Sequence, residues 1–367
     1  MTHSQRRERL AASLVAIGVD ALLVSDLMNV RYLSGFTGSN AALLVFADDT
    51  GPVLATDSRY VTQAARQAPD LEAAIERACG RHLVTRAIAG GARRVGFESH
   101  VVTVDGYDGL SRALDDHDGA ELVRASGVVE RLREVKDVGE VALLRSACDA
   151  ADAALAALVA GGGLRPGRTE RAVARELEAR MLDYGADGPA FETIVAAGVN
   201  SAVPHHRPTE AELAAGDFVK IDFGALVGGY HSDMTRTFLL GPAAKTADWQ
   251  RDIYALVASA QRAGVAALKR GTPLAEVDAA ARGVIADAGH GEHFGHGLGH
   301  GVGLQIHEAP GIGAAAVGAL RLGSVVTVEP GVYLPGRGGV RIEDTLLVGG
   351  RGAESLSRFP RELTVLD

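Results

Sequence analysis

The sequence has 367 residues, of which 47% are apolar, and its mean hydropathy of +0.10 is typical of a globular chain. This length exceeds the usual size of one domain, so it predicts two domains with separate hydrophobic cores. The formal net charge of -9 argues against a nucleic-acid or anionic-membrane surface, because phosphate groups need a basic face, and it favours a small-molecule or peptide partner. The only cysteines, Cys79 and Cys148, lie far apart without a C-x-x-C motif, so we expect buried, reduced thiols.

The N-terminal segment is expected to form an amphipathic helix rather than a signal peptide. Leu10, Leu14 and Ile17 recur at helical spacing, and Asp20 follows soon after them. No apolar run approaches the roughly 18 residues that a bilayer-spanning helix requires. These features together predict a cytoplasmic protein.

The first third of the chain alternates helical patterns with short apolar runs, which is typical of an α/β domain with a mixed sheet. Strands are predicted at residues 21–25, 41–46, 52–56, 94–98 and 121–123, with helices at 59–67 and 81–89 between them. The G-F-T-G-S-N run is interpreted as a plain turn. Alternating charges around residues 128–138 mark a boundary, which divides the chain into domains at residues 1–130 and 131–367.

The second domain is expected to repeat one architecture twice. A helix at residues 138–159 ends at three glycines, and a second helix follows with Thr169 as its N-cap and ends near Tyr184. Two more helices are predicted at 248–269 and 273–288. Hairpins follow each pair, so the order helix pair, hairpin, helix pair, hairpin predicts an α+β domain with pseudo-twofold halves.

Each hairpin carries two carboxylates in an otherwise apolar setting. In the first hairpin, a two-residue loop at Val227-Gly228 would place Asp222 opposite Asp233. In the second, a turn centred on residue 336 would place Glu329 opposite Glu343. Facing buried carboxylates repel each other unless a cation lies between them, so this pattern predicts a metal site.

The stretch F-G-H-G-L-G-H-G-V-G-L-Q-I-H-E, residues 294–308, holds His296, His300 and His307. Glycine at every second position from 295 to 303 opposes a helix and predicts an extended strand. The spacing of the histidines leaves open which one binds metal. One neutral imidazole with four carboxylates suits a pair of divalent cations. Manganese or cobalt is the first candidate and zinc a further one, whereas calcium and magnesium fit an imidazole ligand less well.

Five sequence blocks then identify a family resemblance. In order, they are K-I-D-F-G with G-Y-H-S-D-M-T-R-T-F, then H-G-L-G-H-G-V-G-L-Q-I-H-E, T-V-E-P-G-V-Y and V-R-I-E-D-T. The second domain resembles the pita-bread metallopeptidases of the Xaa-Pro dipeptidase (prolidase) and aminopeptidase P group. The first domain resembles the creatinase-type N-terminal domain of the same group. The resemblance implies a creatinase-type α/β domain followed by a pita-bread catalytic domain.

The resemblance also implies roles for particular residues. His205 and His307 match histidines that contact the substrate and shuttle protons, and His296 matches one that lines the pocket for the proline side. Arg341 matches an arginine that orients the site. Glu329 or its partner carboxylate would accept a proton from a water activated between the metals. The five positions that match the family's metal ligands are Asp222, Asp233, His300, Glu329 and Glu343.

The implied activity is hydrolysis of Xaa-Pro bonds by an Xaa-Pro dipeptidase with two divalent ions, Mn²⁺ first and Co²⁺ or Zn²⁺ as alternatives. Aminopeptidase P, which acts on longer peptides, is the nearest alternative, and a homodimer is expected because relatives are commonly dimers. Methionine aminopeptidase ranks lower, because it lacks the large N-terminal domain. A peptide-binding module without catalysis and a lyase or other hydrolase are further hypotheses.

Three aromatic side chains near these motifs stay outside the predicted site. The role of His231 is left open: it either supports the metal ligands or is structural. His206 is interpreted as a bystander beside His205. Tyr333 is left open between packing and a hydrogen bond near the metals.

Overall fold

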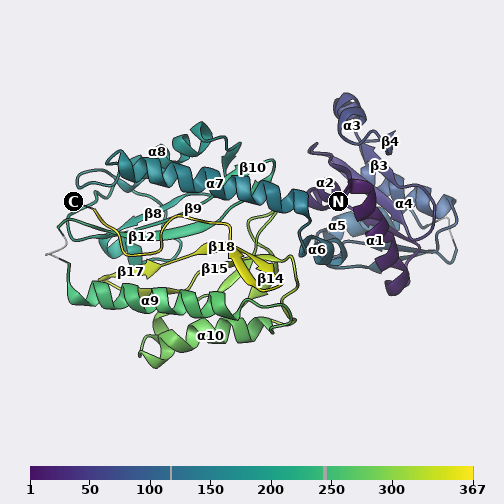
Figure 1. Cartoon of the computed structure of the whole chain (residues 1–367). Helices are drawn as coiled ribbons and strands as arrows, with labels where there is room; N and C mark the ends of the chain where they lie inside the picture. The colour runs from purple at the N-terminus through teal and green to yellow at the C-terminus, as the bar shows by residue number, and fades with distance from the viewer. Residues whose placement is uncertain (116–117, 243–245, 367) are drawn as a thin grey trace. The chain divides into compact units, whose positions relative to one another are not determined.

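The computed structural model describes residues 1–115, 118–242 and 246–366. The chain forms two compact units, Met1–Arg133 and Glu134–Asp367, each with its own helices and strands (Figure 1). Within the described ranges, no helix is both long enough and apolar enough to cross a bilayer.

The first unit is built on a six-stranded sheet in the order β4-β3-β2-β1-β5-β6. β1 pairs antiparallel with β2 and parallel with β5, so the sheet is mixed as predicted. The strands are β1 (Ala21–Val24), β2 (Ala41–Phe46), β3 (Val53–Thr56), β4 (Glu72–Ile75), β5 (Arg94–Phe97) and β6 (Glu121–Arg124). The helices are α1 (His3–Ile17), α2 (Leu27–Ser34), α3 (Val61–Gln67), α4 (Cys79–Ala89), α5 (Val104–Ser111) and α6 (Val128–Arg133), with a 3-10 turn η1 (Ser58–Tyr60) before α3.

All strands and helices predicted for this unit are present, but β4 and three helices were not predicted. β4 reads E-A-A-I and is mostly exposed at the sheet edge, so it lacks an alternating apolar pattern. The missed helix α2 is preceded by its N-cap Asp26, whose carboxylate accepts hydrogen bonds from Met28 N and Asn29 N. The segment at residues 35–40 is irregular, as expected for a turn.

The second unit contains two helix pairs with strands between them (Figure 1). Thr169 caps α8 by accepting a hydrogen bond from Ala172 N, as predicted. The helices are α7 (Val138–Ala160), α8 (Glu170–Asp183), α9 (Asp248–Ala267) and α10 (Leu274–Asp287), with 3-10 turns η2 (Gly198–Ala202) and η4 (Gly291–His293). The first-half strands are β7 (Gly188–Pro189), β8 (Ile194–Ala197), β9 (Phe218–Phe223), β10 (Ala225–Val227), β11 (Tyr230–His231) and β12 (Met234–Leu240). The later strands are β13 (Gly299–Gly301), β14 (Glu308–Ile312), β15 (Val325–Val328), β16 (Gly331–Leu334), β17 (Gly338–Arg341), β18 (Asp344–Gly349), β19 (Gly352–Ser355) and β20 (Val365–Leu366).

Two hydrophobic clusters reproduce the predicted halves. One joins buried side chains of α7 and α8 to β8, β9 and β12, and the other joins α9 and α10 to the strands from β15 to β18. The order of helix pair, hairpin, helix pair, hairpin is therefore observed. The cavity described below is lined by residues from both halves.

The register of the first hairpin differs from the prediction. Val227 pairs with Tyr230, so the loop consists of Gly228 and Gly229, both with positive φ. A two-residue loop with positive φ at both positions favours glycine over valine, which is why it does not use Val227. Asp222 consequently pairs with Thr235 rather than facing Asp233, and the predicted facing pair is wrong.

The register of the second hairpin agrees with the prediction. Val328 pairs with Asp344, and Gly331 pairs with Arg341. The same register places Glu329 opposite Glu343, each in a short break between two paired segments. These breaks let both carboxylates leave the regular ladder of hydrogen bonds.

Candidate metal centre

A cavity of about 480 Å³ in the second unit collects every residue that the sequence analysis assigned to the site. The expected ligands reach it from different elements, and they are Asp222 on β9, Asp233 before β12, His300 on β13, Glu329 after β15 and Glu343 before β18. The other assigned residues on its wall are His205, His296, His307 and Arg341.

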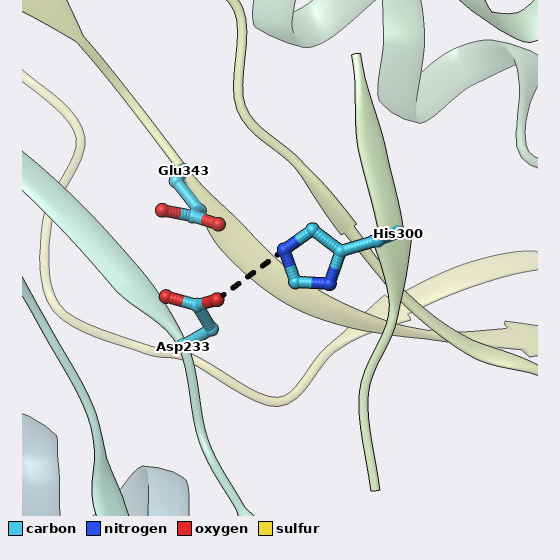
Figure 2. A group of neighbouring side chains, drawn as sticks. All are labelled: Asp233, His300 and Glu343. Carbon is cyan, nitrogen blue, oxygen red and sulfur yellow. Dashed lines mark ion pairs between the residues drawn. The ribbon is translucent and has the colours of Figure 1, made fainter. Parts of the chain in front are cut away.

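Three of these side chains approach closely enough to share one ion. Asp233, His300 and Glu343 each offer a ligand atom, and these atoms lie within 4.8 Å of one another. Figure 2 shows the His300 ring pointing toward the carboxylates of Asp233 and Glu343, which come from two other segments of the chain. Nε2 of His300 lies 3.5 Å from Oδ2 of Asp233 and 3.3 Å from Oε1 of Glu329.

The backbone of the histidine stretch orients His300 for this contact. Nδ1 of His300 lies 3.0 Å from the carbonyl oxygen of Gly301, so a proton on Nδ1 is donated to that oxygen. In the neutral ring, Nε2 then presents its lone pair to the carboxylates of Asp233 and Glu329. A lone pair facing carboxylates is repulsive unless a proton or a metal cation lies between them.

The charge of the cluster is unbalanced in the absence of a cation. Burial, followed by repulsion from the neighbouring carboxylates, raises the pKa of both Asp233 and Glu343. Oδ1 of Asp222 and Oε1 of Glu343 are buried and have no hydrogen-bond donor among the described residues. Carboxylate oxygens with an imidazole nitrogen are a ligand set that divalent transition metals accept, so the residues present fit such ions.

Two threonines hold the carboxylates in place. Thr235 Oγ1 donates to Oε2 of Glu343 at 2.6 Å, and Thr327 Oγ1 donates to Oε1 of Glu329 at 3.2 Å. Thr235 is also the residue that pairs with Asp222 across the hairpin. The observed register, which differs from the predicted one, therefore brings the hydroxyl of Thr235 to the carboxylate cluster as a hydrogen-bond donor.

A chain of hydrogen bonds connects the carboxylates to His296. The buried guanidinium of Arg341 donates to Asp222 and, at 2.7 Å, to the hydroxyl of Tyr333. The Tyr333 hydroxyl lies 2.9 Å from Nε2 of His296, whose Nδ1 lies 2.8 Å from the carbonyl oxygen of Gly297. A proton on Nδ1 leaves Nε2 to accept from Tyr333, so the open interpretation of Tyr333 is resolved in favour of a hydrogen bond.

The remaining histidines differ in their surroundings. The ring of His307 packs edge-on against His300, with 4.4 Å between ring centroids, and burial followed by the charge of His300 lowers the pKa of His307. Nδ1 of His231 lies 3.0 Å from the carbonyl oxygen of Gly303, and this contact ties the strand of His231 to the histidine stretch. His206 is not a bystander, because its Nε2 lies 2.7 Å from the buried carboxylate of Glu170.

The histidine stretch is only partly extended. The strand prediction holds for Gly299–Gly301 and is wrong for most of the remaining positions. Gly299 and Gly301 serve close packing: a Cβ at Gly299 would lie 2.1 Å from the carbonyl oxygen of Thr327, and one at Gly301 would lie 2.2 Å from that of Ala309. Backbone crowding explains these two glycines better than a long strand does.

Two sequence-family models match the chain, one over most of each unit. The sequence model described as metallopeptidase family M24 matches residues 142–349, and the one described as the creatinase/prolidase N-terminal domain matches residues 6–135. These matches confirm the resemblance and the fold class that were expected from the sequence blocks.

Individual relatives cover nearly the whole chain. A solved structure described as an Xaa-Pro dipeptidase from Bacillus anthracis is similar at 38% identity with a TM-score of 0.93, and the match covers 100% of each chain. An Xaa-Pro dipeptidase of Pyrococcus horikoshii is 34% identical over 94% of this chain and 94% of its own. The structure of an X-Pro aminopeptidase from Thermotoga maritima is similar at 33% identity with a TM-score of 0.87, over 98% of this chain and 99% of its own.

Proposed function

The chain belongs to metallopeptidase family M24 and is a hydrolase, and from this premise we propose that it is an Xaa-Pro dipeptidase. The relatives described as Xaa-Pro dipeptidases support this activity, because they match over nearly their entire length. The observation that carries the proposal is the cavity in which four carboxylates and His300 converge beside further histidines.

We propose that two divalent metal ions occupy this cavity, with Mn²⁺ as the first candidate and Co²⁺ or Zn²⁺ as alternatives. When bound, they would supply a water of lowered pKa and polarise the scissile carbonyl. The unpartnered oxygens of Asp222 and Glu343 and the orientation of His300 support this assignment. The residues proposed to hold the ions are Asp222, Asp233, His300, Glu329 and Glu343.

The other residues of the cavity bind and orient the substrate in this proposal. Glu329 accepts the proton of the attacking water, and His307 and His205 donate hydrogen bonds to the oxyanion that develops at the carbonyl. Arg341 holds Asp222 in place, and His296 lines the pocket for the proline ring. A bond to proline has no N–H group, so a site that works through the carbonyl oxygen can cleave it.

An assay of two substrates tests this function. Metal-stripped protein is reloaded with Mn²⁺ and given an Xaa-Pro dipeptide or an Xaa-Pro-Xaa tripeptide, with Asp233→Ala as the inactive control. We expect cleavage of the dipeptide that depends on the metal and is lost in Asp233→Ala. A preference for the tripeptide would instead support the alternative of aminopeptidase P, which the dipeptidase relatives do not favour. Absence of cleavage with every metal would support a peptide-binding module.

The setting of the enzyme is also a proposal. We expect a cytoplasmic homodimer, as the sequence analysis predicts. Light scattering on the purified protein at several concentrations measures the mass directly. A mass near that of one chain, 38.0 kDa, at all concentrations would contradict the dimer.

A further inference from the structure

His205 reaches the cavity wall from a segment with little regular structure of its own. This segment, residues 197–209, contains the 3-10 turn η2 followed by an irregular stretch. An irregular segment can hold a side chain in one place only if other elements fix its backbone. Two buried side chains from neighbouring elements, Glu170 and Lys220, contact the backbone or side chains of this segment.

The first anchor is Glu170, the first residue of α8, whose exposed fraction is 0%. Its Oε1 accepts hydrogen bonds from Ala197 N and from Asn200 Nδ2, both at 2.9 Å. Its Oε2 accepts from His206 Nε2 at 2.7 Å and from both Thr209 N and Thr209 Oγ1, at 2.9 and 2.8 Å. This one carboxylate therefore binds the beginning, the middle and the end of the segment.

The second anchor is Lys220 on β9, whose exposed fraction is also 0%. Its Nζ donates to the carbonyl oxygens of Ser201 at 3.1 Å, Val203 at 2.6 Å and Pro204 at 3.3 Å. Arg341 Nη1 also donates to the carbonyl oxygen of Pro204, at 3.2 Å. Three carbonyl oxygens of one segment therefore surround the Lys220 nitrogen.

We propose that Glu170 and Lys220 are positioning residues that together fix His205 on the cavity wall. Both chain neighbours of His205 are anchored, Pro204 through Lys220 and His206 through Glu170. Neither anchor is among the residues that line the cavity, so both act through the segment and not on the substrate. This inference rests on the proposed function, in which His205 contacts the substrate.

The consequence for catalysis follows from geometry. A hydrogen-bond donor to a developing oxyanion works only when it is held at the right position before the reaction. A displacement of about 1 Å by a distant change can lower the rate on the order of 10²-fold. The two anchors would hold the His205 ring to within about 1 Å of its position on the cavity wall, although the segment that carries it has little regular structure.

Glu170→Gln tests the first anchor with a small change of shape. The glutamine amide has one oxygen, so in either orientation its NH₂ group faces N–H donors of the segment. We expect kcat to fall on the order of 10- to 100-fold with a smaller change of KM. In a His205→Ala background, the same substitution should change kcat little, because both changes then remove the same contribution.

A matched control separates positioning from general loss of stability. Glu98 in the first unit is a buried carboxylate that accepts from Ser25 N and Asp26 N at 2.6 and 2.7 Å. Glu98→Gln should lower the melting temperature and leave kcat unchanged. If Glu170→Gln does not fold, Asn200→Ala replaces it, since this substitution removes one donor and retains the carboxylate.

A second readout does not depend on peptidase activity. In metal-free protein, amide hydrogen exchange of residues 197–209 should become faster in Glu170→Gln and remain unchanged in Glu98→Gln. If Xaa-Pro peptides are not cleaved at all, this measurement still tests the anchoring. Unchanged exchange, wild-type kcat in Glu170→Gln, or additive losses in the double variant would each overturn the inference.

Discussion

Tyr333 connects two functional parts of the cavity through one hydroxyl group. It accepts a hydrogen bond from Arg341, which holds Asp222, and donates to His296. Burial raises the pKa of Tyr333 to about 12, so the phenol remains protonated at neutral pH and can serve as this donor. The proposed metal ligands and the proposed proline pocket are thereby linked in one hydrogen-bonded chain.

We predict that Tyr333→Phe raises KM for an Xaa-Pro dipeptide by roughly 10-fold, since loss of a buried hydrogen-bond partner costs about 1–3 kcal/mol. Steady-state kinetics measure this change. Tyr254→Phe is the matched control, because Tyr254 is also buried and donates to the carbonyl oxygen of Arg361 in the same unit. Equal effects of both substitutions on KM would contradict a specific role of Tyr333.

Glu170 predicts how stability depends on pH. Burial raises the pKa of Glu170, but hydrogen bonds from Ala197 N, Asn200, His206 and Thr209 outweigh it, and the net pKa is below the ordinary value of 4.5. A carboxyl group with a lowered pKa in the folded state stabilises the protein above its unfolded pKa. This contribution disappears as the pH falls through the lowered value.

The melting temperature of Glu170→Gln should therefore lie below that of the wild type at pH 6, and the difference should shrink as the pH falls below about 4.5. Thermal unfolding monitored by circular dichroism from pH 6 to pH 3 measures the difference. The titratable groups facing this carboxylate are His206 and Asp217, and both residues are retained in the variant. A difference that stays constant over this range would show that the charge of Glu170 is not the cause.

At the residue scale, the sequence predicted the members of the site better than their supports. Asp222 and Asp233 stand out as charges in apolar runs, and the histidine stretch stands out by its glycines. Lys220 also lies in such a run, but its partners are backbone carbonyl oxygens that carry no sequence signal. Glu170 follows a helix cap like many first-turn glutamates, and only the fold brings residues 197–209 against it.

At the scale of elements, turn chemistry decided which hairpin could be predicted. The turn of the second hairpin was centred correctly on Gly336, and the predicted register of Glu329 and Glu343 is confirmed. The first loop offered Val227, Gly228 and Gly229, and the two glycines form it. Since a shift of the loop by one residue moves every cross-strand partner, Asp222 meets Thr235 instead of Asp233.

β13 gives a prediction at the same scale. Gly299→Ala would place a Cβ 2.1 Å from the carbonyl oxygen of Thr327, which cannot move without shifting β15. We expect a loss of about 1–3 kcal/mol in the free energy of unfolding, together with weaker metal binding, because His300 is the next residue. Denaturant unfolding and metal content after dialysis measure the two effects.

Gly295→Ala is the control for this substitution. It lies in the same glycine-rich stretch, but among the described residues no heavy atom beyond its two chain neighbours lies within 4 Å of the position that its new Cβ would occupy. Its stability and metal content should match those of the wild type. Similar losses in both variants would mean that the flexibility of the stretch, and not the contact at Gly299, is responsible.

At the scale of the whole molecule, each unit has its own hydrophobic core, and the proposed metal ligands all belong to the second unit. The first unit has its own hydrophobic cluster around the mixed sheet, and the second has two clusters around the cavity. All of the carboxylates proposed as metal ligands lie in the second unit. Where the two units unfold separately, a ligand that binds only the folded second unit stabilises that unit and leaves the first unit unchanged.

Removal of metal should accordingly lower the unfolding temperature of one unit only. Without a cation, the buried carboxylates of Asp233 and Glu343 repel each other. A metal present at 100 times its Kd stabilises the folded unit that binds it by about 2.7 kcal/mol. Differential scanning calorimetry with and without a chelator measures the shift, and hydrogen exchange assigns each transition to residues of the first or second unit. Asp233→Asn, which weakens the cluster, should show a smaller response to the chelator. An equal shift of both transitions would mean that the metal acts outside the cavity or that the units unfold together.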